Sequence, residues 1–190
     1  METREQILSV ALEQIQRKGY NGFSYADIAE AVGIRKASIH HHFATKADLG
    51  KEVTVQYRHD FKTTLSSIEG GKVSNIQKLE AYINLFRQTL EQDHKVCLGI
   101  MLAATHEILP DGVRTEVKKF FQDNEVWLTR LLRKGQEVGD FEFKADPSEV
   151  AISILSVLEG AMVIAESLED PGRLGAATKW VLSSVEKRQI

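Results

Sequence analysis

Cysteine, proline and long apolar runs are all scarce in this chain of 190 residues. Its single cysteine, Cys97, has no partner for an intrachain disulfide, so a disulfide-stapled fold is excluded and a reducing cytoplasm is the expected setting. The longest apolar stretch, residues 150–165, contains Glu159 and is shorter than the roughly 20 residues that a spanning helix needs. We therefore expect no membrane association.

An excess of positive charge is also lacking. The formal net charge is −3, and the six lysines and arginines of residues 1–50 are matched by six aspartates and glutamates. A protein with this balance has no general basic field for attracting nucleic acid. If the first 50 residues bind DNA, they must do so through a few well-placed cations.

Strong helix formers and helical spacing of apolar residues dominate what is present. The pattern predicts an all-α fold of about nine helices. The expected helices cover residues 3–18, 24–32, 36–43, 45–67, 76–90 and 111–138, with a short helix near Cys97 and two later helices that begin at Asp146-Pro147 and Asp170-Pro171. Aspartate before proline is a typical helix start.

Two short helices joined by a tight turn are expected near the N-terminus. Ser24 and Asp27 have capping-box spacing at the first of them, and Gly33 follows its end. This is the helix-turn-helix pattern. We predict a DNA-binding domain over residues 1–48 and a second domain over residues 49–190.

The stretch 23–43, followed by Thr45-Lys46-Ala47-Asp48-Leu49, resembles the N-terminal domain of the tetracycline-repressor (TetR) family. The resemblance lies in the apolar skeleton, the turn glycine Gly33, the histidine run that ends in Phe43 and the lysine Lys46. It implies a homodimeric repressor that binds a double-stranded DNA operator and is released by a small-molecule effector.

A helix that enters the major groove needs short polar or cationic side chains on its exposed face. Lys36, Ser38, His40 and His41 provide them, while Ile39 anchors the opposite face. Residues at the helix starts are expected to contact phosphates. The candidate DNA-binding residues are Ser24, Tyr25, Arg35, Lys36, Ala37, Ser38, His40, His41, His42 and Lys46.

Neither a metal nor another cofactor is predicted. The three consecutive histidines 40–42 do not suit a metal ion, since neighbouring helical residues point about 100° apart. The family resemblance implies a small-molecule pocket within the later helices. The candidate lining residues are Phe86, Cys97, Met101, Thr105, His106, Phe121, Trp127 and Glu159.

The helix that begins at Pro147 is apolar on two sides, which predicts that it packs on its own chain and on a second subunit. The following helix is expected to complete a four-helix seam between two copies. The residues predicted at this interface are Ile154, Leu155, Leu158, Met162, Leu174, Val181 and Val185.

Three alternatives remain open at this stage. The segment 97–104 resembles a branch of the family that responds to oxidants or electrophiles, and a helix N-terminus with Lys95 and His94 nearby would favour a Cys97 thiolate. An enzyme is disfavoured because no nucleophile–base pair, phosphate-binding glycine loop or zinc spacing is found. A helical protein-interaction module is the third, and salt-dependent binding to promoter DNA would separate it from a repressor.

Overall fold

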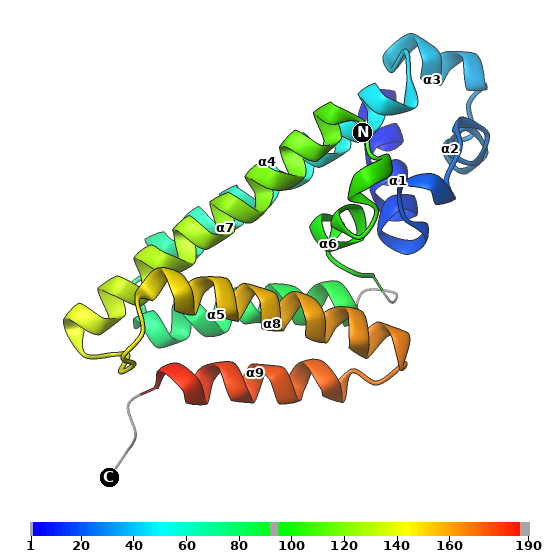
Figure 1. Ribbon diagram of the computed structural model, residues 1–190. Helices are drawn as coiled ribbons and strands as arrows, with labels where there is room; N and C mark the ends of the chain where they lie inside the picture. Colours follow the sequence, from blue (N-terminus) through cyan, green and yellow to red (C-terminus); the bar gives the residue numbers. More distant parts are fainter. Residues whose placement is uncertain (1, 92–94, 187–190) are drawn as a thin grey trace. The chain divides into compact units, whose positions relative to one another are not determined.

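The computed structural model describes residues 2–91 and 95–186 of the chain. Within these residues nine α-helices and no strands are present, which confirms the predicted all-α fold (Figure 1). The helices are α1 (Thr3–Lys18), α2 (Tyr25–Val32), α3 (Lys36–His42), α4 (Lys46–Gly70), α5 (Asn75–Glu91), α6 (Leu98–Ala103), α7 (Asp111–Val138), α8 (Pro147–Ser167) and α9 (Gly172–Val185).

Several helix ends follow from local capping chemistry. The predicted bounds of α7 agree with the structure, and the Asp146 side chain accepts a hydrogen bond from the backbone N–H of Ser148 at the start of α8. The predicted range 3–18 agrees with α1 as well. The spacing of Thr3 and Gln6 also suits a capping box, but Glu2 is the N-cap, and its backbone N–H donates to the Glu5 carboxylate over 3.2 Å.

The described chain forms two compact units. The first contains residues 2–61 and 95–120, and the second contains residues 62–91 and 121–186. The helices α4 and α7 each contribute residues to both units. The domain boundary that we placed after residue 48 stays a prediction.

The first unit is built around α1. This helix packs on α2 and α6, and the side-chain amide of Gln16 donates a hydrogen bond to the Val96 carbonyl over 3.1 Å. Its core includes Ile7, Ile28 and Ile39, each of which is inaccessible to solvent. Full burial of such a side chain stabilises a fold by about 1.5–3 kcal/mol, so these residues fix the positions of α2 and α3.

The second unit consists mainly of α5, α8, α9 and the later half of α7. The helices α8 and α9 lie side by side (Figure 1) and pack closely along their lengths. Tyr82 is fully buried among aromatic rings, stacked on Trp127 at a centroid distance of 5.4 Å and edge-on to Phe86 at 5.3 Å. Its hydroxyl donates to Asn124 Oδ1 over 3.0 Å.

Helix α8 is longer than the apolar stretch that we counted in the sequence. Among the described residues it is the one helix long and apolar enough to cross a membrane by length and composition. Leu158 and Met162 of α8 are fully buried in the chain itself. Because the core helix of a globular protein passes the same test, this feature is weak evidence for a membrane.

The side chains predicted to form the subunit interface are buried within the single chain. Ile154, Leu155, Leu158, Met162, Leu174, Val181 and Val185 each expose 4% or less of their surface. They therefore belong to the chain's own core and do not by themselves present an apolar surface to a second copy. The large apolar side chains exposed on these two helices are Ile152, Ile164 and Trp180, and Leu168 at the C-cap of α8 is exposed too.

Candidate nucleic-acid interface

The start of α2 is fixed by a reciprocal pair of hydrogen bonds. The backbone N–H of Ser24 donates to Asp27 Oδ2 over 2.6 Å, and the backbone N–H of Asp27 donates to Ser24 Oγ over 3.3 Å. Hydrogen bonds from the side chain and backbone of Ser24 hold the pKa of Asp27 below its usual value. The predicted capping box is confirmed, and the Ser24 side chain remains exposed at the surface.

The turn between α2 and α3 depends on a glycine. Gly33 has φ +75° and ψ 33°, a left-handed conformation that side chains with a Cβ disfavour. Its backbone N–H closes α2 by donating to the Ala29 carbonyl over 2.9 Å. Arg35 then stands at the N-cap of α3, and its side chain makes no capping hydrogen bond within the described residues.

Helix α3 is anchored on one face and exposed on the other. Ile39 is fully buried, and Phe43 just after the helix is 3% exposed. The predicted DNA-binding residues of this segment divide as follows: Arg35, Lys36, Ala37, His40, His41 and His42 are exposed, and Ser38 is half-buried. The second helix of the motif thus presents a polar, cationic surface to solvent.

Tyr25, which we predicted to contact DNA, is a buried residue that packs and hydrogen-bonds within its own unit. It is 6% exposed, and its hydroxyl donates to the Phe43 carbonyl over 2.9 Å. Its ring lies 4.7 Å from the ring of His40, whose Nδ1 is 3.2 Å from the Ala44 carbonyl oxygen. The hydroxyl hydrogen of Tyr25 is therefore already used inside the unit, so a phosphate contact from this residue rests on its backbone N–H.

Lys46 is also held by its own chain. Its Nζ donates to the Phe23 carbonyl over 2.7 Å and lies 4.2 Å from the centroid of the Phe23 ring. Partial burial lowers the pKa of Lys46. Since an ammonium has three donors, this arrangement leaves N–H groups for an external anion.

The same residues form one shallow concave surface beside α3. It is lined by Phe23, Ser24, Tyr25, Lys36, His40 and Lys46. Five of the ten predicted DNA-binding residues therefore lie together, with two ammonium groups beside an exposed helix start. Such a surface suits a phosphate of a nucleic acid backbone.

Sequence reasoning missed two residues that support this surface. The carbonyl of Phe23 holds Lys46, and Arg4 lies 5.2 Å from the centroid of the Phe43 ring while pairing with Glu52 over 2.6 Å. No local pattern signals the contacts of Arg4, because its partners are about 40 or more residues away in the chain.

The eight candidate effector residues are divided between the two units. Cys97, Met101, Thr105 and His106 belong to the first, and Phe86, Phe121, Trp127 and Glu159 belong to the second. His106 is exposed, whereas Phe86, Trp127 and Glu159 are buried. Phe86 and Trp127 are brought together through Tyr82, which both contact.

Cys97 is buried at 4% exposure, and its Sγ accepts a hydrogen bond from the Tyr57 hydroxyl over 3.7 Å. Reactive cysteines are partly exposed thiolates, so this setting gives no support to an oxidation switch. His94, which we had placed near the thiol, lies outside the described residues.

Tyr25 gives a pH-dependent test of this part of the fold. Burial, with smaller contributions from Asp48 and Tyr20, raises its pKa from the ordinary 10.0 to about 12. Between these values the unfolded chain loses the phenol proton and the folded chain keeps it, so the free energy of unfolding falls as the pH rises through this window. In Tyr25→Phe the free energy of unfolding should decrease less over this pH range, because the titrating phenol is absent.

At neutral pH, Tyr25→Phe is expected to lower the free energy of unfolding by about 1 kcal/mol, since the hydrogen bond to Phe43 is lost. Urea unfolding at a series of pH values measures both effects. Tyr20→Phe is the control for the hydrogen bond at neutral pH, because the Tyr20 hydroxyl makes no hydrogen bond with the rest of the described chain. It is no control for the pH dependence, since burial raises the pKa of Tyr20 as well. Equal losses at neutral pH from the two variants would contradict the assignment.

Comparisons with known proteins agree with this geometry. A family model for bacterial regulatory proteins of the tetR family matches residues 7–53, and a model for a tetracyclin repressor-like C-terminal domain matches residues 75–181. The HTH-type transcriptional repressor DhaR of Mycobacterium sp. (strain GP1) is 26% identical over 161 residues, which are 84% of this chain and 80% of that protein.

Solved structures agree as well. A TetR-family transcriptional regulator from Agrobacterium tumefaciens is 34% identical, with a TM-score of 0.93 over 97% of both chains. A TetR transcriptional regulator from Legionella pneumophila is 31% identical, with a TM-score of 0.91 over 98% of both chains.

An anchored helix-turn-helix with an exposed, polar second helix defines a DNA-binding regulator. The two family models, which match residues 7–53 and 75–181, identify the family more specifically than the motif alone does. The chain belongs to the TetR family of bacterial transcriptional regulators. Its relatives are regulators and not enzymes, which confirms the prediction that it is not an enzyme.

Proposed function

We propose that this protein is a homodimeric, cytoplasmic repressor that binds a two-half-site operator and is released by a small-molecule effector. The observation that carries the proposal is the surface around α3. Lys36 and His40 lie there with the start of α2 and with Lys46, while Ile39 holds the helix from behind. We propose Arg35, Lys36, Ala37, Ser38, His40 and His41 for the groove, and Ser24, Tyr25, His42 and Lys46 for phosphates.

The dimer part of the proposal rests on exposed apolar side chains. Ile164, Leu168 and Trp180 are 52%, 55% and 56% exposed. Apart from its two chain neighbours and the backbone of its own helix, Gly160 has no described heavy atom within 4 Å of the position that a Cβ would take. Gly160, Ile164 and Leu168 follow one another at intervals of four residues, so they lie along one helical row, and exposed apolar side chains beside an open glycine favour close approach of another helix. The occupant that fits the family resemblance is a second copy of this chain.

The effector part rests on the aromatic interior of the second unit. Tyr82, Phe86 and Trp127 provide the apolar surface that small-molecule sites usually have. We propose that the occupied second unit disfavours simultaneous docking of two α3 helices on half-sites about 34–36 Å apart. A structure of the protein purified with its natural ligand would identify the chemical class.

Binding to the promoter region beside its own gene tests the proposed function. Fluorescence anisotropy with a labelled duplex should give a dissociation constant of about 10⁻⁸–10⁻¹¹ M, at least roughly a thousandfold tighter than for a scrambled duplex at equal salt. Affinity should fall steeply as salt increases, because phosphate contacts release counterions. Equal binding to both duplexes at every salt concentration would refute the proposal.

A further inference from the structure

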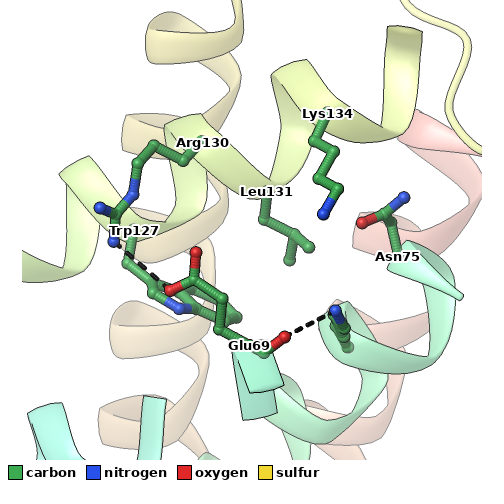
Figure 2. A pocket seen from close by; sticks show the side chains of 7 residues that line it. Glu69, Asn75, Trp127, Arg130, Leu131 and Lys134 are labelled. Carbon is green, nitrogen blue, oxygen red and sulfur yellow. Dashed lines mark hydrogen bonds and ion pairs between the residues drawn. The ribbon is translucent and has the colours of Figure 1, made fainter. Parts of the chain in front are cut away.

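A small cavity in the second unit is rich in positive charge. It lies where the end of α4, the start of α5 and the later half of α7 meet, and its volume is about 80 Å³. Its lining residues are Glu69, Asn75, Lys78, Trp127, Arg130, Leu131 and Lys134. In Figure 2 the side chains of Lys134 and Asn75 approach it from one side and those of Glu69 and Arg130 from the other.

Lys78 is the unusual member of this set. It is 7% exposed, and its Nζ donates to the backbone carbonyl of Glu69 over 2.8 Å. This neutral oxygen is its one partner among the described residues. A buried ammonium without a nearby counter-charge is costly, and an anion beside it would offset that cost.

The neighbouring charges do not balance Lys78. The Glu69 carboxylate lies 3.6 Å from the Arg130 guanidinium, and Lys134 has no ion-pair partner in the part of the chain that the structure describes. Asp140 stands behind Asn75 and accepts hydrogen bonds from its backbone N–H and its side-chain amide, over 3.0 and 2.7 Å. Even when Asp140 is counted, the site contains three cationic side chains and only two carboxylates, so one positive charge is left over.

We propose that this cavity binds a small oxyanion, either a carboxylate or a phosphate group. Lys78 and Lys134 donate charge-assisted hydrogen bonds to it, and Trp127 and Leu131 form the apolar wall of the site. The volume of about 80 Å³ holds only a few molecules of water, whose share of the liquid is about 30 Å³ each. Whole drug-sized ligands need about 300–1,000 Å³, so the occupant is a small anion or the anionic end of a larger ligand.

Tryptophan fluorescence reports directly on this site. The chain has two tryptophans, Trp127 in the cavity wall and the exposed Trp180, so Trp180→Phe leaves Trp127 as the one reporter. Titration with inorganic phosphate or acetate should give a saturable change, whereas sodium chloride at equal ionic strength should not. The anion that saturates at the lower concentration identifies the group.

Matched lysine variants in the Trp180→Phe background decide between a site and general screening. Lys134→Gln is expected to weaken anion binding about tenfold or more, since it removes a charged donor. Lys144→Gln, which removes an exposed lysine outside the cavity, should leave binding unchanged. Equal affinities for the two variants, or an equal response to chloride, would overturn the proposal.

Lys78→Met provides an independent second variant, and its folding is checked by circular dichroism. The folded variant should show no saturable response to either anion, and a retained response would overturn the role of Lys78. If it fails to fold, the comparison of Lys134→Gln with Lys144→Gln decides. None of these measurements involves DNA, so their outcome is independent of the proposed repressor function.

Discussion

Replacing Ile164 by glutamate is expected to dissociate the proposed dimer into monomers and to weaken operator binding by roughly a hundredfold or more. Ile164 is 52% exposed in the single chain, so the substitution should change the stability of the monomer little. In a dimer it would bury an unpaired carboxylate between two subunits. A monomer then binds one half-site without the gain from a tethered second contact.

Ile152→Glu is the matched control for this prediction. Ile152 belongs to the same helix and is 49% exposed, but it lies about 120° away from Ile164 around the axis of α8. Light scattering should give twice the 21.3 kDa chain mass for the wild type and Ile152→Glu, and the single chain mass for Ile164→Glu. A dimeric Ile164→Glu variant would place the subunit interface elsewhere.

Lys36→Gln is expected to weaken operator binding by about 5- to 150-fold, the range that corresponds to one base or charged contact of about 1–3 kcal/mol. Lys36 is exposed at the start of α3 and lines the concave surface beside it. Its exposed side chain makes no hydrogen bond or ion pair with the other described residues, so the thermal midpoint should stay near that of the wild type. Anisotropy with the operator duplex measures the affinity.

Lys118→Gln removes the same charge from an exposed position of the same unit, away from α3. Because salt screens charges that are more than about 10 Å apart, this variant should bind the operator with nearly the wild-type affinity. If the two lysine variants weaken binding equally, the effect is general electrostatic attraction and α3 has no special role.

The parts of this fold that depend on local chemistry were predictable from the sequence. The Ser24–Asp27 capping box, the left-handed Gly33 and the bounds of α7 agree with the structure because each depends on residues a few positions apart. The range of α1 was also predicted correctly, although the spacing of Thr3 and Gln6 suggested a capping box that Glu2 and Glu5 form instead.

The sequence does not show which helix faces pack against each other inside the chain and which remain exposed. Periodicity shows that α8 has two apolar rows, but it does not show which row the chain itself covers. Leu158 and Met162 were predicted for a partner and are in the core, whereas Ile164 and Leu168 are exposed. The anionic-ligand cavity was not predictable either, because Glu69, Lys78 and Lys134 come together from three separate helices.

The contact between His40 and Ala44 has a consequence for the chemistry of the exposed helix. A carbonyl oxygen can only accept, so the 3.2 Å contact assigns the ring proton of the neutral imidazole to Nδ1. The other nitrogen, Nε2, then carries a lone pair. In the major groove a lone pair complements the exocyclic amino groups of adenine and cytosine, whereas cationic side chains complement guanine. The short helix α3 thereby offers a hydrogen-bond acceptor at His40 as well as the donors of its cationic side chains.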